Sequence, residues 1–147
     1  MKIGLACDHR GYPLKEQIKK ELEKKELEVV DYGTDSTEST DYPDYAFILG
    51  ENVANKTVDF GVAICGSGIG ISIACNKVKG VRCAKVDSLT DVVATRTDND
   101  ANIIAFSEKI PFYKAINWIE TFINCKASTE EKHERRRNKI KAYEERI

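Results

Sequence analysis

The sequence is poor in the features that mark metal centres, disulfide frameworks and membrane segments. Its five cysteines form no CxxC pair, and its only histidines are His9 and His133, whereas a zinc site needs closely spaced thiolates or imidazoles. No apolar run approaches the roughly 20 residues that span a bilayer, and the apolar stretch at the N-terminus is too short for a secretory signal. We therefore expect a cytoplasmic protein with free thiols, no metal, no cofactor and no membrane partner.

The charge balance excludes a further class of function. The chain has 23 Lys and Arg residues against 24 Asp and Glu residues, so no overall field attracts it to nucleic acid. No repeat, linker or low-complexity segment divides the 147 residues, and this length suits one domain with a buried core. We expect a single domain over residues 1–147.

Apolar, β-rich runs alternate with segments of helical periodicity along the chain. The predicted strands are 2–7, 28–33, 60–65, 81–86 and 102–106. Between the first two, Leu14, Ile18 and Leu22 recur every four residues, as on one face of a helix. A further helix is predicted at about 129–146. This alternation predicts an α/β fold with a parallel sheet covered by helices on both faces, and ligands bind beyond the carboxyl ends of such strands.

The strongest chemical signal is the segment CGSGIG at 65–70, which follows a predicted strand and precedes a helix. Glycines at 66, 68 and 70 allow backbone N–H groups to turn towards a bound anion, and a helix N-terminus favours negative charge. The dinucleotide fingerprint lies at the first strand–helix turn, and a Walker loop ends in GK[ST], so neither motif matches. A tight structural turn is the alternative interpretation.

Cys65 stands at the beginning of this loop, where a helix N-terminus would favour its thiolate. The cysteine is therefore a candidate base or nucleophile, and a buried core cysteine is an equally good interpretation of its position. A thiol hydrolase would pair Cys65 with a histidine. His9 and His133 are both distant from Cys65 in sequence, which does not exclude such a pair, so this class of enzyme is a further alternative. Ser67 could exchange a proton or bind an oxygen, although serine is common in turns.

Other polar residues also follow strands or share helix faces. Asp8 and His9 come after the first strand, where Asp8 could cap a helix or contact a ligand, and His9 favours a ligand. Tyr42 is expected mainly to pack. Lys132 and Arg136 are four residues apart on one predicted helix face, so both could reach one phosphate. A solvated helical face is the alternative interpretation of this charged segment.

Several blocks resemble, in order and spacing, the ribose-5-phosphate isomerase B family. They are CDHRGYPLK, DYGT, TDYPDYA, CGSGIGISIACNK, GVR and DNDAN. The family includes galactose-6-phosphate isomerase subunits and allose-6-phosphate isomerases. The resemblance implies a three-layer α/β/α Rossmann-like domain with five strands, which forms homodimers or homotetramers with active sites between subunits and uses no metal or nucleotide.

The resemblance also implies roles for the candidate residues. Cys65 is similar to the base that moves a proton between C2 and C1 of the open sugar, and Ile71 stands where a second catalytic type has glutamate. Ser67 is similar to the residue that handles the sugar hydroxyl. The implied substrate-binding residues are Asp8, His9, Tyr42, Gly66, Gly68, Ile69, Gly70, Asn99, Lys132 and Arg136.

Two positions depart from the family pattern, and the first leaves the substrate open between ribose 5-phosphate and its hexose relatives. Asp98 stands where the family commonly has a ring-opening histidine, and its ordinary pKa of about 3.9 makes it a poor acid at neutral pH. Lys132 replaces an arginine and lacks its bidentate fork. The alternatives are a galactose-6-phosphate or allose-6-phosphate isomerase, as a subunit or alone, and a non-catalytic sugar-phosphate-binding module.

Overall fold

The computed structural model describes residues 1–147 and contains one five-stranded sheet, whose strand pairs are all parallel. The strands are β1 Lys2–Cys7, β2 Glu28–Asp31, β3 Phe60–Cys65, β4 Cys83–Lys85 and β5 Ile103–Ser107. Their order in the sheet is β2-β1-β3-β5-β4. The predicted α/β class and parallel sheet are therefore confirmed, and β1, β3 and β5 lie side by side at its centre.

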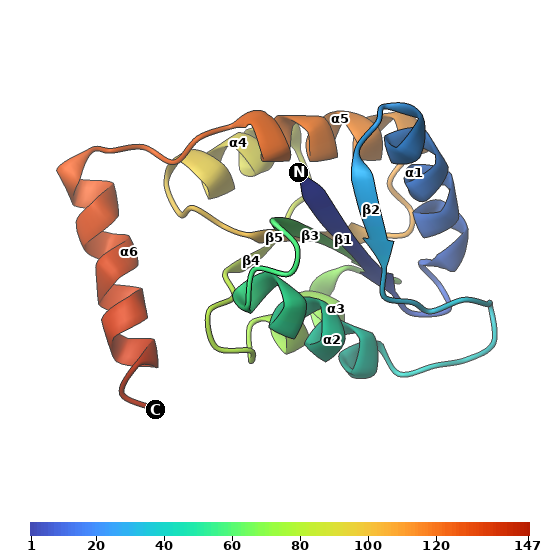
Figure 1. Ribbon diagram of the computed structural model, residues 1–147, viewed down its shortest axis with the longest axis horizontal. Coiled ribbons are helices and arrows are strands. Elements are labelled where there is room, and N and C mark those ends of the chain that lie inside the picture. Colours follow the sequence, from blue (N-terminus) through green and yellow to red (C-terminus); the bar gives the residue numbers. More distant parts are fainter.

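Helices cover both faces of the sheet, as Figure 1 shows. They are α1 Tyr12–Lys24, α2 Tyr42–Ala54, α3 Ile69–Cys75, α4 Leu89–Thr97, α5 Phe112–Asn124 and α6 Glu131–Glu144. One core of 18 buried residues joins the sheet to α1, α4 and α5. A second core of 13 buried residues joins the other face to α2 and α3. The three-layer arrangement is that of a Rossmann-like fold.

The predicted periodicity of α1 is confirmed by its packing. Leu14, Ile18 and Leu22 are all buried, and a proline stands in the first turn, where its missing N–H does no harm. Burial of each such side chain contributes about 1.5–3 kcal/mol. The edge strands β2 and β4 are shorter than predicted, because a strand that pairs on one side only has fewer hydrogen bonds to keep it extended.

The last helix, α6, stands apart from the layers at one end of the molecule (Figure 1). None of its residues is buried. It is tied to the domain by Arg137, which donates to the backbone oxygens of Asp98 and Ser128, and by Glu144, which accepts from the N–H of Gly80. No helix in the chain combines the length and the apolar character that crossing a membrane would require.

Candidate active site

A cavity of about 360 Å³ opens at the carboxyl ends of the three central strands. Because β1, β3 and β5 are neighbours in the sheet, the segments that follow them converge there, joined by the beginning of α2. The lining residues are Asp8, Arg10, Tyr42, Cys65, Gly66, Ser67, Gly70, Ser107 and Lys109. The expected location of a ligand site beyond the carboxyl ends of the strands thus coincides with a cavity.

Cys65 is the last residue of β3 and lines this cavity, although only 4% of its surface is exposed. Cys65 is thus a core residue that also faces the opening of the cavity. Its Sγ accepts a hydrogen bond of 3.1 Å from the backbone N–H of Gly68. A sulfur atom in this environment is held in one orientation at the cavity wall.

The other thiols differ from Cys65 in surroundings. Burial raises the pKa of Cys7 to about 12. A hydrogen bond with Cys75, together with burial, raises the pKa of Cys83 well above its ordinary value. Neither Cys7 nor Cys83 lines the cavity. Cys65 is therefore the thiol whose place suits chemistry on a bound ligand.

The loop after Cys65 presents unpaired backbone donors. No backbone or side-chain hydrogen bond of the chain uses the N–H groups of Gly66, Ser67 or Gly70. Gly68 has φ of +80°, and a Cβ there would lie 2.7 Å from the carbonyl carbon of Phe106. Glycine is therefore required for this turn. The loop is both a tight turn and a set of donors that an anion can occupy.

Two side chains cover the glycines at the ends of the loop. A Cβ on Gly66 would lie 2.7 Å from Nη1 of Arg10, and a Cβ on Gly70 would lie 2.7 Å from Cζ of Tyr42. Tyr42 lines the cavity, so packing, which we expected from the sequence, does not describe its whole role. The tyrosine forms one wall of the candidate site.

Asp8 and His9 are both committed in part to local structure. Asp8 is buried and lines the cavity, and its Oδ1 accepts from the N–H groups of Arg10 and Gly11, each at 3.0 Å. Gly11 holds the N-cap position of α1 without a side-chain cap, so the capping interpretation of Asp8 is wrong, and the carboxylate closes the turn that precedes the helix. His9 does not line the cavity, and its Nδ1 accepts from the N–H of Thr40 at 3.1 Å. Its Nε2 is the nitrogen left for a ligand.

The remaining candidates lie elsewhere in the chain. Asp98 and Asn99 follow α4, whose end is at the amino edge of the sheet, opposite to Cys65. Lys132 and Arg136 are exposed on α6. Asp98 meets α6 through His133, whose Nε2 is 3.7 Å from its Oδ1. One chain therefore holds two separate groups of candidates, one around Cys65 and one around Asp98.

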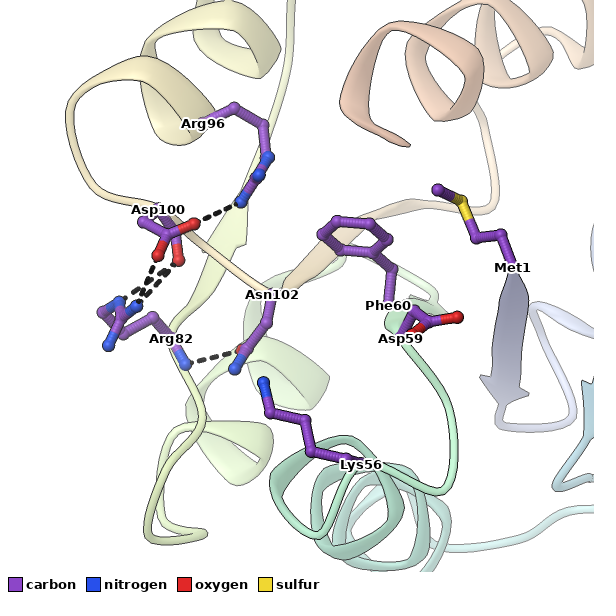
Figure 2. A pocket seen from close by; sticks show the side chains of 8 residues that line it. All are labelled: Met1, Lys56, Asp59, Phe60, Arg82, Arg96, Asp100 and Asn102. Carbon is purple, nitrogen blue, oxygen red and sulfur yellow. Dashed lines mark hydrogen bonds and ion pairs between the residues drawn. The ribbon is translucent and has the colours of Figure 1, made fainter. Parts of the chain in front are cut away.

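A second cavity, of about 350 Å³, lies at the amino edge (Figure 2). Arg96 and Arg82 both point at Asp100 there, with nitrogen–oxygen distances of 2.7 and 3.3 Å. Arg82 also donates to the backbone oxygen of Asn99 at 2.9 Å. These contacts fix the segment that carries Asp98 and Asn99, so the arginines have a structural task here.

Sequence reasoning missed three residues of the first cavity, namely Arg10, Ser107 and Lys109. Ser107 donates its hydroxyl to the backbone oxygen of Gly66 at 2.7 Å, and Lys109 is exposed. All three lie at or just after the ends of β1 and β5. The strand-end rule indicated these places, but no motif distinguished the residues themselves.

Comparison with known proteins gives the family. The family model described as Ribose/Galactose Isomerase matches residues 3–140. The putative sugar phosphate isomerase YwlF of Bacillus subtilis is 40% identical over 146 residues, covering 99% of this chain and 98% of the relative. The structure of Clostridium thermocellum ribose-5-phosphate isomerase B is 39% identical, with a TM-score of 0.94 and 99% of both chains covered.

A further solved relative carries a ligand. Ribose-5-phosphate isomerase B from Mycoplasma genitalium, solved with bound ribulose 5-phosphate, is 34% identical, with a TM-score of 0.91 and coverage of 99% of this chain and 97% of that chain. These matches extend over the motifs on which the resemblance was based and over the whole fold. The resemblance is confirmed, and the chain belongs to the ribose/galactose isomerase family.

Proposed function

We propose that this protein interconverts ribose 5-phosphate and ribulose 5-phosphate, with Cys65 as the catalytic base, and that residues 1–147 act as one domain. The observation that supports this most is the place of Cys65, at the wall of a cavity whose adjoining loop has three unpaired N–H groups. Relatives named ribose-5-phosphate isomerase B, one of them with ribulose 5-phosphate bound, support the choice of substrate.

The proposed reaction is a proton transfer along the sugar. The Cys65 thiolate removes the proton from C2 of the open aldose, the C–H electrons form a C1–C2 double bond, and the C1 carbonyl oxygen becomes an oxyanion. The thiol then returns the proton to C1 while Ser67 helps to move the hydroxyl proton from O2 to O1. The N–H groups of Gly66, Ser67 and Gly70 are suited to stabilise the enediolate more than the starting sugar.

The second group of candidates acts, in this proposal, from another copy of the chain. None of these four residues lines the cavity of its own chain, namely Asp98, Asn99, Lys132 and Arg136, so a partner subunit in a homodimer or homotetramer would bring them to Cys65. Exposed apolar side chains on α3 and α4 support such an assembly, namely Ile69, Ile73, Leu89 and Val93. His9, Lys132 and Arg136 would then hold the phosphate.

A hexose 6-phosphate is the second candidate substrate, because Asp98 lacks the imidazole expected of a ring-opening acid. Galactose-6-phosphate isomerase subunits also lack that histidine, so a galactose-6-phosphate or allose-6-phosphate isomerase, with or without a second type of subunit, is the alternative. Lys132 keeps the positive charge and lacks the guanidinium fork, which concerns only the contact with phosphate.

A direct assay separates the possibilities. Turnover is measured with ribose 5-phosphate, allose 6-phosphate and galactose 6-phosphate, and binding of each sugar is measured by calorimetry. Cys65→Ala should abolish turnover and retain binding within a few-fold, whereas Cys125→Ala, a matched change outside the cavity, should leave both intact. Near-full activity of Cys65→Ala would remove the proposed base, and binding without turnover by the wild type would indicate a non-catalytic binding module.

A further inference from the structure

We propose that Arg10 is a substrate-binding residue of the Cys65 cavity. In this proposal Arg10 releases Glu108 and holds the phosphate group of the sugar phosphate. The inference rests on the proposed function, because it names a further ligand of the same site. The starting observation is a contact among residues that follow three neighbouring strands, β1, β3 and β5. No motif in the sequence indicates this contact.

Arg10 and Glu108 form a bridge over the loop that follows Cys65. Arg10 comes after β1 and Glu108 comes after β5, and β3 lies between these strands in the sheet. Nη2 of Arg10 is 3.4 Å from Oε1 of Glu108. The guanidinium lies against Gly66, since a Cβ there would be 2.7 to 3.1 Å from three of its atoms. The cation is therefore held directly above the first glycine of the anion-binding loop.

The pair is weakly held, so the guanidinium is available for a better partner. The side chains of Arg10 and Glu108 are 54% and 29% exposed, and long, exposed ion pairs contribute little to stability. A phosphate dianion carries more charge than the carboxylate and accepts two parallel hydrogen bonds from a guanidinium fork. A sugar phosphate that enters the cavity can thus displace Glu108 from Arg10.

Lys109 adds a second cation to the same wall, because it lines the cavity one residue after Glu108. Asp8 is the acidic side chain among the lining residues, and its Oδ1 is occupied by two backbone N–H groups. Once Glu108 is released from Arg10, the two cations outnumber the Asp8 carboxylate, and the cavity has a surplus of positive charge at its mouth. A singly charged or neutral sugar would gain less from it than a sugar phosphate.

Steady-state kinetics and phosphate inhibition test the role of Arg10. Arg10→Gln should raise KM for the sugar phosphate about tenfold or more, with kcat within about twofold, and should weaken inhibition by inorganic phosphate by a similar factor. Arg10→Lys should recover part of the affinity, and Glu108→Gln should not raise KM. Lys25→Gln is the matched control, because Lys25 forms an exposed pair of 2.9 Å with Glu120 on α5.

The outcomes distinguish this inference from the proposed function. If the wild type turns over none of the sugar phosphates, the proposed function fails, and calorimetric binding of inorganic phosphate to the wild type and Arg10→Gln still tests the arginine. Equal phosphate affinity in the two proteins, or unchanged KM in an active Arg10→Gln enzyme, would overturn the role. A fall in melting temperature with unchanged KM would mean that the Arg10–Glu108 pair is only a structural link.

Discussion

The buried Lys15 makes a strong prediction about the stability of the domain. Its side chain is fully buried, and its Nζ lies 2.6 Å from Oδ1 of Asp31 and 2.6 Å from the backbone oxygen of Thr34. Lys15→Met keeps most of the volume and removes the charge, so the partly buried carboxylate of Asp31 and the buried backbone oxygen of Thr34 lose their donor. Removing one partner of a buried ion pair costs about 3–5 kcal/mol.

The lower end of that range is expected here, because Asp31 keeps other partners. Lys19 remains 3.3 Å from its Oδ2, and the N–H of Gly33 remains 2.9 Å from its Oδ1. We therefore expect Lys15→Met to lower the free energy of unfolding by about 3 kcal/mol, and the melting temperature by about 6–12 °C. Urea and thermal denaturation followed by circular dichroism measure both quantities.

The same variant should change the response of stability to acid. Burial pushes the pKa of Asp31 upwards, but hydrogen bonds from Lys15 and from the N–H of Gly33 outweigh it and lower the pKa overall. A depressed native pKa stabilises the fold above the unfolded value of about 3.9 and loses this effect as the pH falls through the native value. Lys15→Met should therefore lose less stability than the wild type on acidification.

Lys19→Met is the control, since Lys19 is partly exposed and its removal should cost less than about 1 kcal/mol. If the free energy of unfolding of Lys15→Met lies within about 1 kcal/mol of the wild-type value, the Lys15–Asp31 pair is not the stabilising contact described above. The acid response would then also need another cause.

Two further predictions concern the loop and the thiols. Gly68→Ala should lower turnover about a hundredfold, because φ of +80° and the close contact with Phe106 force the loop to shift. Gly80→Ala, also at positive φ but distant from Cys65, should reduce stability and spare turnover, and a fully active Gly68→Ala would show that the loop geometry is not needed. In iodoacetamide labelling at pH 8 followed by peptide mass spectrometry, Cys65 should react before Cys7, whose pKa of about 12 leaves almost no thiolate. Faster labelling of Cys7, or labelling of Cys65 that a sugar phosphate does not slow, would contradict the assigned site.

The fold was predictable where local patterns decide it. The spacing of Leu14, Ile18 and Leu22 specifies a helix with one buried face, and the structure buries all three. Apolar runs specified the strands, and their alternation with helices specified that the strands run parallel. The ends of β2 and β4 were less predictable, because they depend on which strands lie at the edges of the sheet.

The candidate site was predictable only where its residues belong to a motif. The Cys65 loop could be found from its glycines and its place after a strand. Arg10 could not, because its contact with Gly66 depends on the packing of one strand end against another. Tyr42 was expected to pack for the same reason, since a sequence does not tell which side of a helix start meets the loop.

Because α6 stands apart from the layers, its side chains can change without affecting the packing of the two cores. Lys132 and Arg136 sit on a helix that contributes no residue to either hydrophobic core. In the proposed assembly, replacing them would change the charge offered to the phosphate and leave the folding free energy nearly untouched. Under that proposal, affinity for the substrate can drift by surface mutation alone, without compensating changes in the two cores.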